Sequence, residues 1–237
     1  MDQATFADRL EAVEARVRRA LERTGRQRTD IKLVAVTKKF SAGYIQLAYD
    51  SGLRDFGENY VQEFAEKRPN LGDLSAARFH LIGHLQSNKV RSACELFEVI
   101  ETAHSSRILE KLNAAAREQE KRVEILLEIK LSDETSKSGA TAQVLPELLA
   151  QARSCPQLDI TGLMTVPPWS ENPELSRPYF RNLAELARRN GLGQLSMGMS
   201  NDFEVAIEEG ATILRIGTAL FGPRPKPAAV QDSAPAR

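Results

Sequence analysis

The chain has 237 residues, 42% of them hydrophobic and 27% charged, which is enough for one sizeable core and too apolar for a disordered chain. Basic and acidic residues both number 32, so the formal net charge is zero and a dedicated nucleic-acid binder is not expected. The two cysteines, Cys94 and Cys155, lack CxxC spacing, which argues against a disulfide framework. A polar amino terminus and no apolar run approaching about 20 residues predict a cytoplasmic protein without a signal peptide or membrane span.

The first element predicted is an amphipathic helix over residues 4–24. Thr5 with Asp8 resembles a capping box at its start, and Gly25 is a plausible stop. Its apolar residues recur at spacings of three and four, as on one face of a helix: Phe6, Leu10, Val13, Val17 and Leu21.

From residue 31 onward, short apolar segments alternate with amphipathic ones. Strands are expected at 31–37, 53–57, 78–82, 97–100, 122–131, 158–164, 194–197 and 212–216. Helices are expected at 41–51, 58–68, 87–96, 105–121, within 141–154, at 176–190 and at 201–209, with Pro146 starting or kinking the fifth of these. Eight strands, each but the last followed by a helix, predict an α/β fold, a (β/α)₈ TIM-type barrel with an extra N-terminal helix. An open doubly wound sheet is the alternative.

The domain organisation follows from the same pattern. We expect residues 1–222 to form a single barrel domain, with residues 1–25 as its N-terminal helix. Residues 223–237 are rich in proline and alanine, so we expect a disordered tail.

Two adjacent lysines follow the first expected strand, where active-site residues of barrels are found. Burial can lower the pKa of a lysine at such a place, and the neutral amine then attacks carbonyls to form a Schiff base. Lys38 and Lys39 could instead simply solvate the strand end. Alternation does not choose between them, because neighbouring residues of a strand face opposite sides.

Two segments after the last two expected strands are candidates for binding phosphate, as such loops do in many barrels. Ser200 is a candidate N-cap of an expected helix, whose free N–H groups would form an anion site. Gly217 lets the backbone approach a ligand, and Thr218 offers an N–H and a hydroxyl. Ordinary caps and turns are the alternative. Arg215 shares the strand face of Gly217 and would either point to the barrel mouth or pair with a carboxylate.

Other polar residues give weaker indications. His80 and His84 have the spacing of helical zinc ligands, but they straddle a strand and a loop, and no third ligand is evident. Glu58 is a candidate general acid or base, or else a charged residue in the first turn of a helix. Lys137 lies in a polar loop that would contact a ligand, close as a lid, or remain solvated.

Seven segments resemble the pyridoxal phosphate homeostasis protein family, of the YggS/PROSC type. They occur in order over residues 31–222: AVTK ending at Lys38, FGENYVQE (56–63), HLIGHLQSNK (80–89), SDETSKSG (132–139), GLMTV (162–166), SMGMSNDFEVAI (196–207) and RIGTALFG (215–222). The resemblance implies a barrel similar to that of alanine racemase. It also implies pyridoxal 5′-phosphate (PLP) held as a Schiff base by Lys38 rather than Lys39. Five further residues are implied as cofactor contacts: Ser200, Gly217 and Thr218 at the phosphate, Arg215 facing the pyridine nitrogen, and Asn59 against the cofactor.

The function implied by the resemblance is to carry or buffer PLP and regulate its intracellular level, without efficient catalysis. We expect no counterpart of the second, β-rich domain that supplies a catalytic tyrosine in alanine racemase. An arginine facing the pyridine nitrogen leaves the ring a weaker electron sink than a carboxylate partner would. The expected partners are PLP and PLP-dependent apoenzymes as recipients, with no specific nucleic acid, no membrane and a monomeric chain. The alternatives are a single-domain PLP-dependent amino-acid racemase and a Schiff-base aldolase that does not use PLP.

Overall fold

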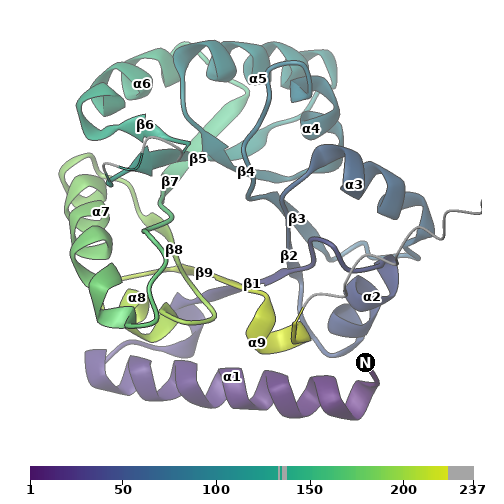
Figure 1. The fold of residues 1–237 in the computed structure, drawn as a ribbon. Helices are drawn as coiled ribbons and strands as arrows, with labels where there is room; N and C mark the ends of the chain where they lie inside the picture. Colours follow the sequence, from purple (N-terminus) through teal and green to yellow (C-terminus); the bar gives the residue numbers. More distant parts are fainter. Residues whose placement is uncertain (133, 135–137, 224–237) are drawn as a thin grey trace, which may run out of the picture.

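The computed structural model describes residues 1–132, 134 and 138–223. Within them, eight parallel strands form a ring: β1 (Lys32–Val36), β2 (Asp55–Glu58), β3 (Arg78–Leu81), β4 (Val99–Ala103), β5 (Val123–Lys130), β7 (Leu158–Met164), β8 (Gln194–Met199) and β9 (Ile213–Ile216). β1 pairs with both β2 and β9, and β4 pairs with β5, so the ring is closed (Figure 1). The predicted TIM-type barrel is confirmed, and the doubly wound alternative is wrong. The two-residue β6 (Ala140–Thr141), which the sequence did not reveal, pairs with β5 outside the ring.

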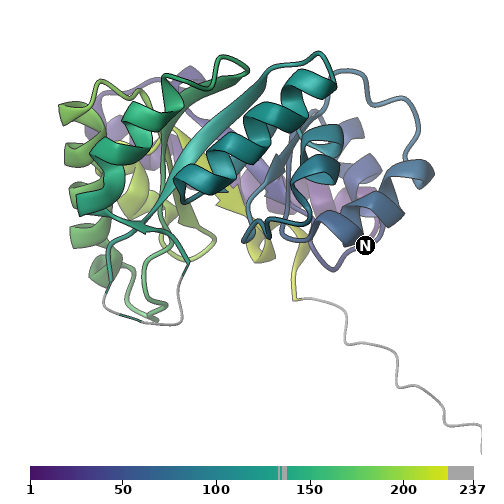
Figure 2. The ribbon, with the colours of Figure 1, turned by 90° about the horizontal axis from the view of Figure 1, so that it is seen from above.

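The helices lie around the outside of the ring, as the views along the barrel and from its side show (Figure 1, Figure 2). They are α1 (Gln3–Thr24), α2 (Ala42–Asp50), α3 (Val61–Lys67), α4 (Val90–Leu96), α5 (Ser106–Glu118), α6 (Leu145–Ala152), α7 (Arg177–Arg189), α8 (Phe203–Glu208) and α9 (Thr218–Phe221). Single 3₁₀ turns occur at Arg28–Asp30, Arg68–Asn70, Ala142–Val144 and Pro173–Ser176. In the described part of the chain, no helix has the length and apolar character needed to cross a bilayer.

The N-terminal helix α1 packs on the outside of the barrel, against α8 and α9. Its apolar face is buried as predicted, with Phe6 and Val17 fully inaccessible. The predicted capping box is wrong: Asp2 caps the helix, and its side chain accepts a hydrogen bond from the Thr5 backbone N–H at 2.8 Å. Gly25 ends the helix in the left-handed conformation, with φ of 68°, which glycine adopts without a steric cost.

Alternation along the strands creates two cores. Residues that face outward, such as Leu33 and Ala35 of β1, pack beneath the helices in one large cluster. Residues that face inward form a small apolar layer in the middle of the ring: Val34, Val99, Leu126, Met164 and Ile213. Polar side chains fill the ring above and below this layer, so that each end of the barrel contains a different set of polar residues.

Several predicted boundaries change in ways that bear on the site. Glu58 is the last residue of β2 rather than the first of a helix, because α3 begins only at Val61. Pro146 lies in the first turn of α6, so it starts that helix and does not kink it. The last strand is followed by a helix after all, the short α9. The later start of α3 leaves a short loop, with Asn59, at the carboxyl end of β2.

Candidate functional site

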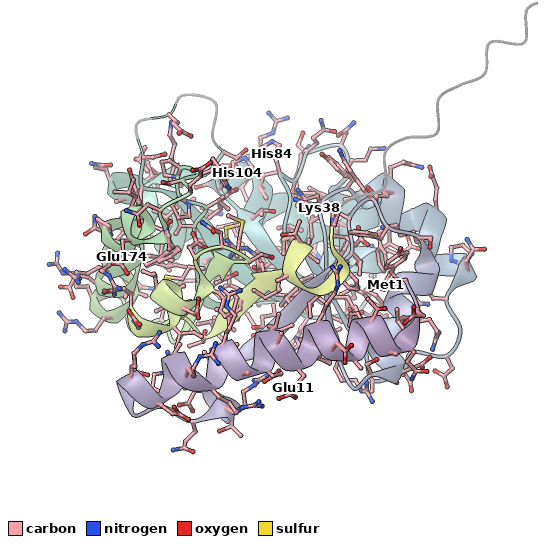
Figure 3. The ribbon with its side chains drawn as sticks, turned by 60° about the horizontal axis from the view of Figure 1, so that its bottom comes forward. Met1, Glu11, Lys38, His84, His104 and Glu174 are labelled. Atoms are coloured by element: carbon pink, nitrogen blue, oxygen red, sulfur yellow. The ribbon has the colours of Figure 1, made fainter. Side chains whose placement is uncertain are left out.

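All six residues predicted to contact a cofactor line one cavity of about 360 Å³ at the carboxyl ends of the strands. They are Lys38, Asn59, Ser200, Arg215, Gly217 and Thr218. They come from the ends of β1, β2, β8 and β9, which are separated in sequence but adjacent once the ring closes. Figure 3 labels Lys38 together with His84 and His104, which follow β3 and β4 at the same end of the barrel.

Strand alternation explains why Lys38, and not Lys39, lines the cavity. Val34 and Val36 face the inside of the ring, and continuing the period of two brings Lys38 to the same side. Lys39 is exposed on the outside, where its backbone N–H donates to the Glu63 carboxylate on α3. Lys38 is half-buried at the cavity wall.

Arg215 is held rigidly beneath this cavity, with only 4% of its surface exposed. One guanidinium nitrogen donates to the Ser196 hydroxyl at 2.5 Å, and another donates to the Thr165 carbonyl at 2.8 Å. The Glu101 carboxylate lies 3.9 Å from the same guanidinium. Both alternatives predicted for Arg215 are therefore confirmed: it faces the barrel mouth, and its guanidinium charge is compensated by the Glu101 carboxylate below it.

A chain of buried polar groups continues from Arg215 through the inside of the ring. Ser196 donates to Glu101, which also contacts His80 Nδ1 at 2.7 Å, and His80 Nε2 lies 3.0 Å from Asp55. Burial disfavours protonation of His80, but its hydrogen bonds to Asp55 and Glu101 outweigh burial and raise its pKa. Burial alone would raise the pKa of Glu101, yet His80 and Arg215 lower it. Sequence reasoning missed Glu101 because nothing local distinguishes it.

This network also accounts for the histidine pair considered as a metal site. His80 is fully buried with both ring nitrogens on carboxylates, whereas His84 is exposed at the rim. There the His84 ring packs against His104, with centroids 4.8 Å apart. Across the described residues, no cluster of three or more potential metal ligands is found.

The segments that follow β8 and β9 meet on one side of the cavity. The Ala219 backbone N–H donates to the Ser200 hydroxyl at 3.1 Å, which ties the loop after β8 to the start of α9. The prediction that Ser200 caps the following helix is wrong, because α8 begins at Phe203 and Asp202 precedes it. Gly198, in β8 where the pairing with β9 shifts register, has φ of 90°, and a Cβ there would lie 2.6 Å from Ala206 Cβ, so this position needs glycine.

Further lining residues were not anticipated. The loop after β7 contributes Val166, Pro168 and Trp169, the last with 75% of its surface exposed at the mouth. Within the described part of the chain, the buried Asn59 Oδ1 atom has no hydrogen-bond partner. Lys137, suggested above as a ligand contact, lies outside the described residues.

Glu128, on the inner side of β5, is a second buried group that the sequence did not single out. Its exposed fraction is 8%, and its Oε2 atom has no hydrogen-bond partner among the described residues. Burial raises the pKa of Glu128 to about 7, although the charge of Arg215 opposes the rise. The carboxyl end therefore contains a carboxylate that titrates near neutrality.

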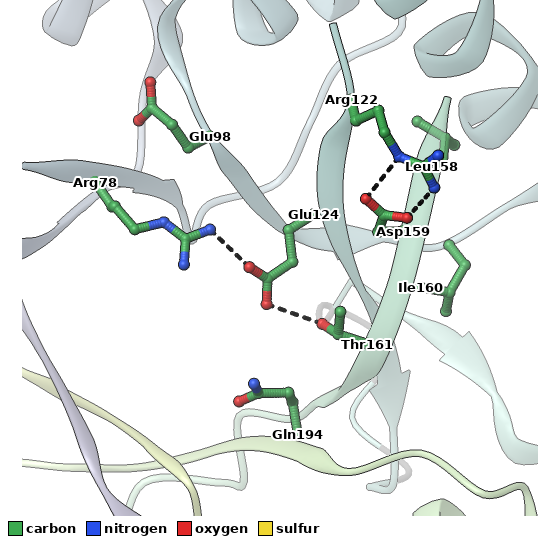
Figure 4. Close-up of a pocket in the computed structure, with 9 residues that line it drawn as sticks. All are labelled: Arg78, Glu98, Arg122, Glu124, Leu158, Asp159, Ile160, Thr161 and Gln194. Carbon is green, nitrogen blue, oxygen red and sulfur yellow. Dashed lines mark hydrogen bonds and ion pairs between the residues drawn. The ribbon is translucent and has the colours of Figure 1, made fainter. Parts of the chain in front are cut away.

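A larger cavity, of about 770 Å³, opens at the amino ends of the strands (Figure 4). Both of its arginines are paired with carboxylates of the same cavity: Arg78 with Glu124 at 2.7 Å, and Arg122 with Asp159. Glu124 also accepts a hydrogen bond from Thr161 at 3.0 Å. Internal pairing of this kind, at the end of a barrel where residues contribute stability, does not indicate a ligand site.

Comparison with known proteins identifies the family to which this chain belongs. Residues 9–225 match the family model described as alanine racemase, N-terminal domain. The pyridoxal phosphate homeostasis protein of Aquifex aeolicus is 41% identical over 223 residues, covering 92% of this chain and 97% of the relative. That of Escherichia coli K12 is 40% identical over 226 residues, covering 92% and 97%. The chain belongs to the pyridoxal phosphate homeostasis protein family.

Solved structures show the same relationship. The PipY protein of Synechococcus elongatus with PLP bound superposes on this family member with a TM-score of 0.80 at 35% identity, covering 92% of this chain and all of PipY. Alanine racemase of Clostridium difficile 630 gives a TM-score of 0.67 at 14% identity and covers 92% of this chain but 58% of the racemase. At that identity the likeness concerns the fold alone, and it confirms the expected similarity to the racemase barrel.

Proposed function

We propose that this protein binds PLP in the carboxyl-end cavity, with the Lys38 amine holding it as a Schiff base, and that it carries or buffers PLP for apoenzymes. The observation that carries the proposal is the convergence of six residues, distant in sequence, on one cavity. Its volume of about 360 Å³ lies within the range of small-molecule sites. We further infer that residues 1–222 act as one PLP-binding unit and as a monomer.

The donor set fits the chemical groups of PLP. Lys38 offers an amine to the aldehyde. The loops around Ser200, Gly217 and Thr218 offer hydroxyl and backbone donors to a phosphate. Arg215 would face the pyridine nitrogen, and the unpartnered Asn59 Oδ1 would accept from a donor on the cofactor. Support also comes from relatives that are named for PLP homeostasis and from PipY, whose structure contains PLP.

Carriage without efficient turnover is the form of PLP binding that the cavity favours. When bound, PLP can stabilise a carbanion by drawing electrons into its ring. Arg215, fixed by Ser196 and Thr165, only donates hydrogen bonds and does not support a protonated ring nitrogen. A racemase also needs acid–base groups on both faces of the substrate carbon. The described residues that line this cavity include no tyrosine, cysteine or histidine, and Tyr60 lines a neighbouring cavity. Asp202 also lines it, but its carboxylate accepts hydrogen bonds from the Ser176 hydroxyl and the Met199 N–H.

Borohydride reduction of the PLP-loaded protein, followed by peptide mass spectrometry, tests the site. We expect the pyridoxyl group on Lys38, its loss in Lys38→Ala, and its retention in the matched control Lys39→Ala. If the label is lost in Lys39→Ala and retained in Lys38→Ala, PLP is attached to Lys39 and the assignment to Lys38 is wrong. Visible absorption of the loaded protein separates PLP binding from a Schiff-base aldolase that lacks PLP.

The racemase alternative is tested with amino acids in deuterated water, followed by chiral analysis. Lacking one well-placed acid–base group removes about 10²–10⁴-fold in rate, so we expect at most slow exchange. Racemisation at an ordinary enzymatic rate, on the order of 1–10³ s⁻¹, would contradict carriage without catalysis. Exchange without inversion would show that Lys38 reaches the α-proton without a partner on the other face.

A further inference from the structure

A buried lysine lies directly behind the segment that carries Lys38. Lys67, the last residue of α3, is 9% exposed. Its ammonium donates to the Thr37 carbonyl at 2.9 Å and to Glu58 Oε1 at 2.8 Å, and it lies 2.6 Å from Glu63 Oε1. Three acceptors match the three N–H donors of an ammonium group, so this side chain is fully engaged.

The acceptors of Lys67 also hold the residues on both sides of Lys38. Before it, the Thr37 hydroxyl donates to Glu58 Oε1 at 2.8 Å, and the Thr37 backbone N–H donates to the Gly57 carbonyl at 3.0 Å. After it, the Lys39 backbone N–H donates to Glu63 Oε1 at 2.5 Å. Lys67 connects these two sets of hydrogen bonds, because its ammonium contacts both carboxylates and the Thr37 carbonyl.

The backbone of Lys39 has an unusual conformation that depends on the contacts around it. Its φ of 65° lies in the left-handed region, which residues with a Cβ seldom adopt. Such a conformation persists where surrounding contacts over-determine it, and here the contact is the Glu63 carboxylate. The turn directs the Lys39 side chain outward while Lys38 lines the cavity.

We propose that Lys67 is a positioning residue: by bridging Glu58 and Glu63 it fixes the backbone from Thr37 to Lys39, so that Lys38 alone presents its amine to PLP. The inference rests on the proposed function, since it concerns attachment of PLP at Lys38. Lys67 itself does not line the cavity, and it acts through the backbone. A purely structural role would lower stability without changing which lysine reacts, or how fast.

The experiment measures the rate and the site of attachment. Full-length protein is mixed with PLP, reduced with borohydride at timed intervals, and mapped by mass spectrometry for pyridoxyl on Lys38 and on Lys39. In Lys67→Met we expect labelling of Lys38 to slow at least about tenfold, the factor that one hydrogen bond to a charged group is worth. A larger share of label should then appear on Lys39. Lys67→Arg, which can still bridge the carboxylates, should restore most of the rate and selectivity.

Two controls keep the outcomes distinct. Arg78→Gln removes an ion pair at the other end of the barrel and should leave both the rate and the Lys38:Lys39 ratio unchanged. If Lys67→Met does not fold, Glu63→Ala replaces it, because Glu63 is more exposed and its loss should still shift label to Lys39. Wild-type rate and ratio in a folded Lys67→Met or Glu63→Ala protein would overturn the inference. Failure of the wild-type protein to label at Lys38 would instead overturn the proposed function.

Discussion

The two ends of the barrel are made by the same eight strands, yet they differ in how their charged side chains are paired. The amino-end cavity is the larger, about 770 Å³ against about 360 Å³, but its arginines are paired with its own carboxylates. At the carboxyl end, Arg215 lines the cavity and is held from below by Ser196, Thr165 and Glu101. Volume therefore does not identify the site, whereas polar groups arranged toward a common space do.

Removing the Arg215 guanidinium is the substitution for which we expect the largest effect. Arg215→Met leaves Glu101 and Ser196 buried with one partner fewer, and breaking a buried ion pair costs about 3–5 kcal/mol. Urea denaturation should show this loss in the free energy of unfolding, and Arg215→Lys should lose less. If the free energy of unfolding falls by less than about 1 kcal/mol, as for an exposed ion pair, Arg215 is no more important to stability than the ion pairs of the amino end.

Glu128 distinguishes the carboxyl end by its response to pH. Its pKa rises from 4.5 to about 7 in the folded protein, so between these values the folded state binds more protons than the unfolded state. The free energy of unfolding therefore falls as pH rises through this window and stays low above it. At 1.36 kcal/mol per pKa unit, Glu128→Gln should gain up to about 3 kcal/mol at pH 8 and almost nothing near pH 4.

Denaturation of wild type and Glu128→Gln across pH 4–8 measures this difference. Since both proteins share every other titrating group, the difference between their curves isolates Glu128. Parallel curves would show that the Glu128 carboxyl has an ordinary pKa in the folded protein.

The phosphate loops provide the next test, because PLP can be compared with pyridoxal, which lacks the phosphate. Ser200→Ala and Thr218→Val should each weaken PLP binding by about 1.5–3 kcal/mol, the worth of a hydrogen bond to a charged group. Ser200→Ala also removes the acceptor of the Ala219 N–H, so Thr218→Val is the cleaner variant. Titrations should show pyridoxal binding almost unchanged. Equal losses for both ligands, or none in the double variant, would place the phosphate elsewhere.

The smallest effect is expected at the amino end. Arg78→Gln removes a half-exposed ion pair with Glu124, which is worth about 0–1 kcal/mol. PLP affinity should not change, because Arg78 lines only the amino-end cavity. Calorimetric titration with PLP checks this, and a weakened affinity would show that the two ends are coupled through the interior of the ring.

Local patterns predicted the barrel, and together with the family resemblance they predicted six residues that line the carboxyl-end cavity. Strand and helix periods need only residues two to four positions apart, and β7 was bounded correctly at Leu158–Met164. The boundaries that failed depend on other contacts: Ser200 bonds to Ala219 across two loops rather than capping α8. Glu58 extends β2 because it pairs with the neighbouring strand.

By itself, the sequence determined the alternation of strands and helices, the polar residues at the strand ends, and the family likeness that names PLP. The tertiary structure alone decided which face of β1 is inside, and it places Lys38, the lysine that the family resemblance implies, at the cavity wall. It also brought Glu101 to Arg215 and Lys67 to Thr37, contacts that span many residues of chain. The reason is physical: periodicity is a property of neighbours along the chain, whereas a buried charge finds its partner only when the ring closes and brings distant strands together.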